Sequence, residues 1–403
     1  MNVWIESPFD NLPQEGYRAQ RYWLMAQAFA EAGHAVVYWT GDFSHASKSL
    51  RKFVLPLDNA TAKIMLIPTP PYLRNVSFRR VFSHRVYAAR WKKLAINAVR
   101  SHELPPPDLI IASMPTISAA ASALKLGKIF GAKTAVDMMD AWPHTFYRLV
   151  PKMFRPLARV LFVSLHRKVR SVFRNADFVG GVCRSYGEMV AGWGVKNFHL
   201  AYHGIDMTGA VADAREVGNG KLRLVYAGNL GRTYDLGTVL KAVAVDKNTT
   251  LDVAGAGPLE SRWKEMASEL NLADRVRFHG YLGNEELSEL FSRCNLGLVP
   301  MSAESFVGLP YKLCDYVKAA LGVVSSLEGE CNALIREHGI GVTYRPGDVE
   351  SLVSALSDWR QKLEDGFALD FRNLADKLNA KNIYRHYAKS FSKKVSAYTE
   401  EIT

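Results

Sequence analysis

Cysteine and long apolar runs are scarce in this sequence, and each scarcity excludes a class of protein. Four of the 403 residues are cysteines, and their spacing fits no metal-binding pattern, so we expect free thiols in a reducing compartment. No stretch of about 18 residues is apolar throughout, which argues against a membrane-spanning helix. The first residues lack the basic and apolar regions of a secretory signal. We therefore expect a cytoplasmic protein.

Positive charge is concentrated in the first half of the chain. The formal net charge is +12, and residues 1–200 hold 27 Lys and Arg against 12 Asp and Glu. Two segments, 72–100 and 148–174, each contain eight basic residues and no acidic one, interspersed with aromatic and aliphatic side chains. Such segments are typical of helices on an anionic membrane surface, so we expect binding to the inner membrane. Nucleic acid is the competing partner, but no usual recognition module is present, and a plain solvated face is a third interpretation.

Short apolar stretches alternate with amphipathic ones along the chain, whose length suits two domains. The alternation predicts α/β domains with parallel, doubly wound sheets, because strands buried on both faces are apolar throughout. A polar segment at 213–221 marks the break between two sets of strands. Buried strands are predicted at 3–5, 35–39, 63–67, 109–113, 134–138 and 178–182, and then at 222–226, 250–254, 275–279, 296–299 and 323–326.

Two glycine motifs follow consecutive strands of the second set. The first contains Gly228, Asn229 and Gly231 and opens a helix, where backbone amides and the helix dipole favour a phosphate. Arg232 offers a charge-assisted hydrogen bond to the same group. The second motif contains Gly257 and ends the next strand at the same sheet edge. Each motif is also compatible with a plain tight turn, and neither has the G-x-G-x-x-G spacing of a dinucleotide site.

Lys312 and Asp315 lie three residues apart in the first turn of a predicted helix, so they share one face of it. A lysine at this position can meet a diphosphate, and a carboxylate can accept hydrogen bonds from both hydroxyls of a ribose. The alternative is an exposed ion pair, which contributes little to stability.

Three residues of the first half are candidates for a ligand site. Asp140 ends a strand, where a carboxylate can orient or deprotonate an acceptor hydroxyl; the alternative is a helix N-cap before Trp142 and Pro143. Gly16 and Arg18 lie in the loop after the first strand, where a glycine lets the backbone approach a ligand. An ordinary loop is the alternative for these two.

Together these motifs resemble the retaining glycosyltransferases of the group-1 (family 4) type, which have the GT-B fold. The likeness covers nearly the whole chain. It is carried by Ala-Gly-His-Ala-Val at 32–36, His-Gly-Ile-Asp at 203–206, Gly-Ala-Gly-Pro at 255–258, Val-Arg-Phe-His-Gly at 276–280, Asn-Glu-Glu-Leu at 284–287 and Leu-Val-Pro at 298–300.

The chain departs from that family in its donor motifs. The family's Arg and Lys of the first loop fall on Asn229 and Tyr234, and the second of its two glutamates falls on Asp315. The segment 310–316 instead resembles a branch of bacterial surface-polysaccharide transferases with Pro-x-Lys-x-x-Glu-Tyr. It is also similar to the exopolysaccharide glucuronosyltransferase subgroup, which inverts the sugar and has an aspartate matching Asp140 as a proposed base. Retention and inversion both stay open here.

The resemblance implies the α/β GT-B fold, with two Rossmann-like, doubly wound domains that face a cleft. Residues 1–205 and a C-terminal helix at about 383–403 would bind the acceptor, and residues 206–382 the nucleotide sugar. The implied reaction moves a sugar from a nucleotide diphosphate sugar, which we expect to be a UDP-sugar, to a lipid-linked or saccharide acceptor in cell-surface polysaccharide biosynthesis. We expect a retaining enzyme that needs no metal or cofactor and works on the cytoplasmic membrane face.

The resemblance also implies a role for each candidate residue. Lys312 would stabilise the departing diphosphate and Asp140 would handle the acceptor, so these two are the expected catalytic residues. Asp315 would hold the ribose, and the loop at 278–282 would hold the base. The expected donor-binding residues are Gly16, Arg18, Gly228, Asn229, Gly231, Arg232, Gly257, Tyr281, Leu282, Lys312 and Asp315.

Two other classes of function are compatible with the sequence. A nucleotide-sugar epimerase of similar fold would form product without any acceptor. A non-catalytic basic protein that binds membrane or nucleic acid would do so in a salt-sensitive manner, and no nucleotide diphosphate would raise its melting temperature.

Overall fold

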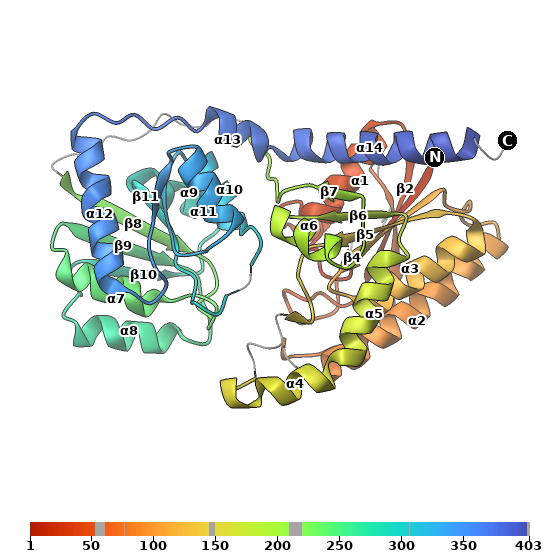
Figure 1. The fold of residues 1–403 in the computed structure, drawn as a ribbon, viewed down its shortest axis with the longest axis horizontal. Helices are drawn as coiled ribbons and strands as arrows, with labels where there is room; N and C mark the ends of the chain where they lie inside the picture. Colours follow the sequence, from red (N-terminus) through yellow and green to blue (C-terminus); the bar gives the residue numbers. More distant parts are fainter. Residues whose placement is uncertain (53–60, 76, 145–149, 209–219, 306, 401–403) are drawn as a thin grey trace. The chain divides into compact units, whose positions relative to one another are not determined.

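The computed structural model describes residues 1–403 except for 53–60, 76, 145–149, 209–219, 306 and 401–403. The chain divides into two compact units (Figure 1). The N-terminal unit contains residues 1–202 and 380–403, and the C-terminal unit contains residues 203–379. The polar segment predicted at 213–221 lies outside the described residues except at its last two positions.

A seven-stranded parallel sheet forms the middle layer of the N-terminal unit. The strand order is β3-β2-β1-β4-β5-β6-β7, so the direction of winding reverses between β1 and β4. Doubly wound sheets bind ligands at such a reversal, outside the carboxyl ends of the strands. The strands are β1 (Asn2–Glu6), β2 (Ala35–Gly41), β3 (Lys63–Ile67), β4 (Leu109–Met114), β5 (Lys133–Met138), β6 (Phe178–Gly181) and β7 (Phe198–Leu200).

Helices cover both faces of this sheet (Figure 1). On one face α1 (Arg21–Glu31) packs with α14 (Ala380–Glu400) around buried residues such as Phe29 and Phe391. The other face is built around Trp91 and is covered by α2 (Phe78–Arg100), α3 (Ile117–Phe130), α5 (Val163–Arg174) and α6 (Arg184–Ala191). Shorter elements are η1 (Pro13–Glu15), η3 (Lys152–Phe154) and α4 (Arg155–Leu161).

A buried ion pair joins α1 to the sheet of the N-terminal unit. The Arg21 guanidinium donates two hydrogen bonds to the Asp137 carboxylate, at 2.7 and 2.8 Å, and both side chains are fully buried. Tyr387 of α14 donates a third bond to that carboxylate at 3.0 Å. Arg21 also donates to the carbonyl oxygens of Ala201 and Tyr202. Because these bonds satisfy both charges in the interior, they fasten α14 to this unit.

A six-stranded parallel sheet forms the middle of the C-terminal unit, in the order β10-β9-β8-β11-β12-β13. Its strands are β8 (Leu222–Ala227), β9 (Thr249–Ala254), β10 (Val276–Gly280), β11 (Leu296–Val299), β12 (Gly322–Ser325) and β13 (Gly341–Thr343). One face packs against α7 (Leu236–Val245), α8 (Glu260–Glu269) and α12 (Val349–Glu364). The remaining helices are α9 (Asn284–Arg293), α10 (Tyr311–Lys318), α11 (Glu330–Glu337) and α13 (Arg372–Lys377) (Figure 1). Both sheets are parallel and doubly wound, so the predicted α/β class with two Rossmann-like domains is confirmed.

Three observations on the structure concern membrane spans, metal sites and cysteine residues. Within the described part of the chain, every helix is too short or too polar to cross a bilayer. The same part contains no group of three or more His, Cys, Asp or Glu side chains arranged to hold a metal ion. The four cysteines are free thiols, and each is buried.

Candidate functional site

The loops after β8 and β9 touch each other at the carboxyl edge of the C-terminal sheet. Gly228 donates its N–H to the Ala254 carbonyl at 2.9 Å, and Leu230 donates to Ala256 at 3.0 Å. Gly228 and Gly255 have φ angles of +144° and +131°, which side chains rarely permit. A Cβ atom on Gly255 would overlap the Gly228 carbonyl group. These two glycines are therefore required for the close approach of the two loops.

A lysine from α10 reaches the first of these loops. The Lys312 ammonium lies so close to Gly228 that a Cβ atom there would collide with it. It lies 5.0 Å from the centre of the Tyr226 ring and 4.4 Å from that of Tyr234. It makes no hydrogen bond or ion pair with any residue that the structure describes. Lys312 therefore supplies a positive charge that faces two aromatic rings and has no salt bridge within the described residues, which favours an anion beside it.

The protonation of Lys312 reflects this environment. Burial lowers the pKa of the Lys312 ammonium to about 8, and the charge of Asp315 acts in the opposite direction. Asp315 lies almost one turn further along α10 and is half-buried. An anion beside Lys312 would restore the pKa of the ammonium toward its usual range, because it replaces the lost solvation.

The loop after β11 is bonded to the same glycine loop. Asp235 donates its N–H to the Pro300 carbonyl at 2.7 Å, and Ser302 donates to Thr233 at 3.0 Å. The Ser305 hydroxyl donates to the same Thr233 carbonyl at 2.8 Å. Loops after β8, β9 and β11 thus form one continuous edge, as the doubly wound topology dictates.

The other predicted donor residues of this unit lie on that edge or on the loop after β10. Asn229 and Arg232 are exposed, and Gly231 is half-buried. Gly257 is packed so tightly that a Cβ atom on it would lie 2.6 Å from the Asn229 side-chain oxygen. The loop after β10 is tied to Gly255 through a hydrogen bond of 2.6 Å to the Gly280 carbonyl. In that loop Tyr281 is 82% exposed and Leu282 is half-buried.

Segment 203–206 anchors the helix that carries Lys312. The His203 ring lies 4.2 Å from the Tyr311 ring, and the His203 carbonyl accepts a bond from the Cys314 thiol at 3.1 Å. Lys318 donates to the Asp206 carbonyl at 2.6 Å. Sequence motifs identified 203–206 only as part of a family likeness, and the structure shows how it holds both ends of α10.

The remaining predicted residues belong to the N-terminal unit. Gly16 and Arg18 are exposed in the loop between η1 and α1, and Gly16 has φ of +80°. Asp140 is half-buried in a turn after β5, and the peptide bond between Trp142 and Pro143 is cis. The predicted residues therefore form two groups: nine, including Lys312, belong to the C-terminal unit and three to the N-terminal unit.

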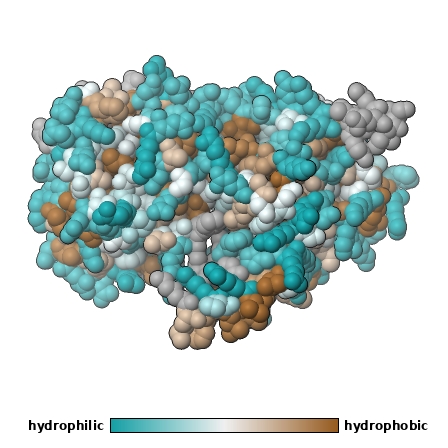
Figure 2. All heavy atoms as spheres, in the orientation of Figure 1, coloured by the Kyte–Doolittle hydropathy of each residue, from teal (hydrophilic) through white to brown (hydrophobic). Residues whose placement is uncertain are grey.

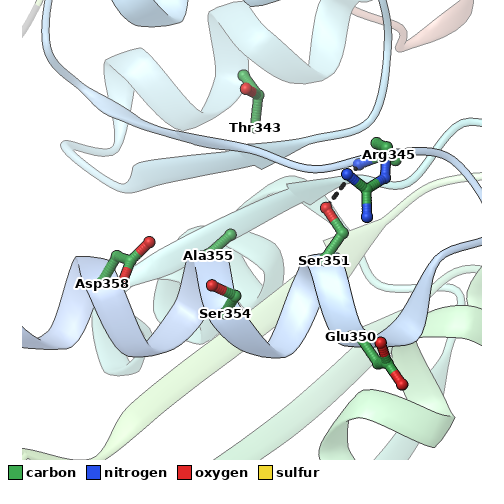
Figure 3. A pocket seen from close by; sticks show the side chains of 7 residues that line it. All are labelled: Thr343, Arg345, Glu350, Ser351, Ser354, Ala355 and Asp358. Atoms are coloured by element: carbon green, nitrogen blue, oxygen red, sulfur yellow. Dashed lines mark hydrogen bonds between the residues drawn. The ribbon is translucent and has the colours of Figure 1, made fainter.

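A polar surface pocket lies elsewhere in the C-terminal unit, between β13 and α12 (Figure 3). Arg345 donates its backbone N–H to the Ser351 hydroxyl at 3.1 Å, and its guanidinium pairs with Asp348 at 2.8 Å. The cation in this pocket is thus already satisfied, and none of the predicted site residues lines it. The lining residues are Thr343, Arg345, Glu350, Ser351, Ser354, Ala355 and Asp358.

Known proteins provide an independent comparison. The family model described as "Glycosyl transferases group 1" matches residues 212–366, most of the C-terminal unit. The uncharacterized glycosyltransferase YqgM of Bacillus subtilis is 32% identical over 106 residues, which are 25% of this chain and 29% of that protein. The chain spans less than half the length of the curated relatives it matches.

Solved structures share the fold over almost the whole chain. Sucrose-phosphate synthase from Thermosynechococcus elongatus superposes with a TM-score of 0.73 at 15% identity, covering 98% of this chain and 99% of that one. Anabaena Alr3699/HepE, solved in complex with UDP and glucose, gives 0.62 at 14% identity, with 98% and 100% covered. The chain thus has the GT-B fold. The match to the group 1 family model lies within the C-terminal unit.

Proposed function

We propose that the chain is a glycosyltransferase that moves a sugar from a nucleotide diphosphate sugar, a UDP-sugar, to an acceptor. The observation that carries this proposal is the Lys312 ammonium, which lies beside Gly228 and forms no salt bridge with the described residues. Both residues lie within the segment that the group 1 glycosyl transferase model matches, residues 212–366. Anabaena HepE, which has the same fold, was solved with UDP. A diphosphate placed on the glycine loop would supply the missing negative charge.

Lys312 supplies the main chemical contribution in this proposal. As the bond between the sugar and the diphosphate breaks, negative charge develops on the leaving phosphate. A nearby ammonium and backbone N–H groups of the glycine loop stabilise that charge more in the transition state than in the ground state. We therefore propose catalysis that requires no metal, with the sugar transferred in the retaining mode of the group-1 type.

The other donor contacts follow from the position of the diphosphate. Asp315 would accept the ribose hydroxyls, and Tyr281 and Leu282 would flank the base. Asn229, Gly231, Arg232 and Gly257 would surround the phosphates, with Gly16 and Arg18 contributing from the N-terminal unit. Asp140 would bind the acceptor hydroxyl and orient it for attack.

We propose a lipid-linked acceptor of cell-surface polysaccharide synthesis, met on the cytoplasmic membrane face. The support is the set of exposed apolar side chains on η3, α4 and the first turn of α2 in the N-terminal unit. They include Leu157 (59% exposed), Val160 (70%) and Phe78 (95%), and Arg159, the neighbour of Val160 in the sequence, is exposed as well. Figure 2 shows hydrophobic atoms gathered over α4. Of the predicted segment 148–174, its first two residues lie outside the described part of the chain.

Thermal shift with nucleotide sugars tests the donor part of the proposal. A ligand that binds only the folded state raises the melting temperature. We expect UDP-sugars to raise it more than GDP-, ADP- or TDP-sugars, and Lys312→Ala to abolish most of that shift. Lys241→Ala removes an exposed lysine from α7 in the same unit and serves as the matched control.

The outcomes of this panel separate the candidate functions. If no nucleotide diphosphate changes the melting temperature, the proposal is wrong and a non-catalytic binding protein is favoured. If the donor alone is converted to another sugar nucleotide without an acceptor, the chain is an epimerase. Release of UDP that requires an added acceptor supports transfer.

A further inference from the structure

A second group of cations lies in the N-terminal unit, close to the predicted catalytic residue Asp140. It gathers at the carboxyl ends of β1, β2, β3 and β5 and at the first turns of α2. Arg80 is its centre: the guanidinium carbon lies 4.8 Å from the Trp142 ring, 5.0 Å from Phe9 and 5.9 Å from Tyr72. We call this group the Arg80 cluster, and its members are Phe9, His45, Lys48, Tyr72, Arg80, His84 and Trp142.

The two cations of the cluster are held by neutral acceptors. Arg80 donates to the Asn75 carbonyl at 2.8 Å and to His84 Nε2 at 3.3 Å. The Lys48 ammonium donates to the Asn75 side-chain oxygen at 2.6 Å and to His45 Nδ1 at 3.2 Å. Neither cation forms an ion pair with a carboxylate in the described part of the chain. The cluster thus contains two positive charges. Burial lowers the pKa of one of them, Arg80, and the negative charge of Asp140 acts in the opposite direction.

Both histidines are neutral and fixed in one tautomer. Burial, together with the charge of Arg80, lowers the pKa of His45 and of His84 to about 3. Lysine and arginine can only donate hydrogen bonds, so His45 Nδ1 and His84 Nε2 must be acceptors. The ring protons are therefore on the opposite nitrogens. The histidines position the cations without neutralising them.

The local backbone also favours a role beyond packing. Lys48 has φ of +56°, a left-handed conformation that is rare for residues other than glycine and costs of order 1 kcal/mol. Burial lowers the pKa of Lys48 to about 8, with the Arg80 charge acting in the same direction. Two cations that destabilise each other are brought together and framed by aromatic faces. An incoming oxyanion would offset the desolvation of the cations and their mutual repulsion.

We propose that the Arg80 cluster binds an anionic group of the acceptor, a phosphate or a carboxylate, between Arg80 and Lys48. This inference rests on the proposed glycosyltransferase function. The rings of Phe9 and Trp142, which are half-buried, offer apolar faces to the part of the acceptor next to that anion. A phosphate would belong to a lipid carrier and a carboxylate to an acidic sugar.

Calorimetric titration of the UDP-saturated protein tests the proposal, because UDP then occupies the donor loop. Geranyl diphosphate and glucuronate are the charged probes, and geraniol and glucose are their uncharged partners. We expect at least one charged probe to bind while its uncharged partner does not. Arg80→Gln should weaken that binding about 10- to 100-fold, the loss typical of a charge-assisted hydrogen bond. Arg79→Gln, an exposed neighbour on the same helix, should leave it unchanged.

Each result decides a point. Binding of geranyl diphosphate alone identifies a lipid phosphate as the source, and binding of glucuronate alone identifies an acidic sugar. Binding that Arg80→Gln leaves intact, or no binding of either charged probe, overturns the proposal. If Arg80→Gln does not fold, Lys48→Met in the loop after β2 makes the same test. The melting shift with UDP is measured on the same samples, so its loss would instead mark failure of the proposed donor site.

Discussion

The Lys312 ammonium lies 4.4 Å from the centre of the Tyr234 ring. In the group-1 family that this chain resembles, a lysine occupies the position of Tyr234. In this chain a positive charge thus reaches the glycine loop from α10. The Tyr226 and Tyr234 rings stabilise the cation through their faces and limit its contact with water. Burial lowers the pKa of the Lys312 ammonium, and an anion beside it would raise that pKa again. This dependence suits a site that must stabilise a departing diphosphate.

Substitution of Lys312 tests this arrangement by its pH dependence. The pKa of Lys312 is about 8, so the ammonium is present below that pH and is lost above it. We expect kcat/KM of the wild type to fall as pH rises through about 8, because this parameter reports groups of the free enzyme. Lys312→Ala should lower kcat by about 10²- to 10³-fold, the usual cost of one transition-state donor.

Lys312→Arg separates charge from shape in the same assay. Arginine keeps its charge well above pH 8, so the fall on the alkaline side should disappear even if overall turnover drops. Lys241→Ala should keep the wild-type profile. An alkaline limb near pH 8 that persists in Lys312→Arg would assign this titration to another group and contradict the assigned role.

The backbone of Gly228 is the second test of the donor site. In Gly228→Ala the new methyl group would collide with the Lys312 ammonium, and φ of +144° is unfavourable for alanine. We expect the UDP-dependent melting shift to be lost and turnover to fall at least about 10-fold, while the protein stays folded. Gly347→Ala is the matched control, because Gly347 also has positive φ but nothing within 4 Å of a Cβ atom. Equal effects of the two substitutions would show that backbone strain alone is responsible.

Sequence patterns predicted the sheets well because parallel strands are buried on both faces. The strand Leu109–Met114, for example, is a largely apolar run that is buried throughout. The strands β7 (Phe198–Leu200) and β13 (Gly341–Thr343) were missed, since each is a three-residue edge strand without an apolar run. Residue patterns thus predict elements that bury enough side chains to leave a periodic signal.

Local motifs predicted single residues of the candidate sites but not the contacts between residues that are distant in the sequence. Gly228 and Lys312 could each be selected from local motifs, but the contact between them joins positions 84 apart and depends on strand order. The partnership of Lys312 with Tyr226 had no local signal. The Arg80 cluster was not predicted at all, because its members follow four different strands and come together only in the folded sheet.

The apolar surface on α4 gives a prediction for membrane binding. Leu157→Ser combined with Val160→Ser and Leu161→Ser removes three side chains that are 59–70% exposed. We expect binding to vesicles with anionic lipid to weaken at least about 10-fold in flotation assays, because buried apolar area drives interfacial binding. Val245→Ser, a similarly exposed residue of the C-terminal unit (61%), is the control. Binding should also decline as salt rises; vesicle binding that the triple variant retains would refute the assignment of this surface.

The buried carboxyl of Glu6 predicts how stability depends on pH. Burial raises the pKa of Glu6 from 4.5 to about 8, although hydrogen bonds from Tyr87 and Ser113 favour the ionised form. Between these two values the folded state keeps a proton that the unfolded state releases. Stability must therefore fall as pH rises from about 4.5 to 8, and this contribution is constant outside that window.

Glu6→Gln removes this titration while keeping a side chain of similar size. The difference in melting temperature between Glu6→Gln and wild type should be more positive at pH 8 than at pH 5. We expect this change to be at least about 2–4 °C, which corresponds to about 1 kcal/mol in a domain of this size. Glu31→Gln, at an exposed site of α1, should give the same difference at both pH values. A Glu6→Gln effect that does not change between pH 5 and 8 would mean that Glu6 is ionised throughout, and that the interior around β1 solvates its charge.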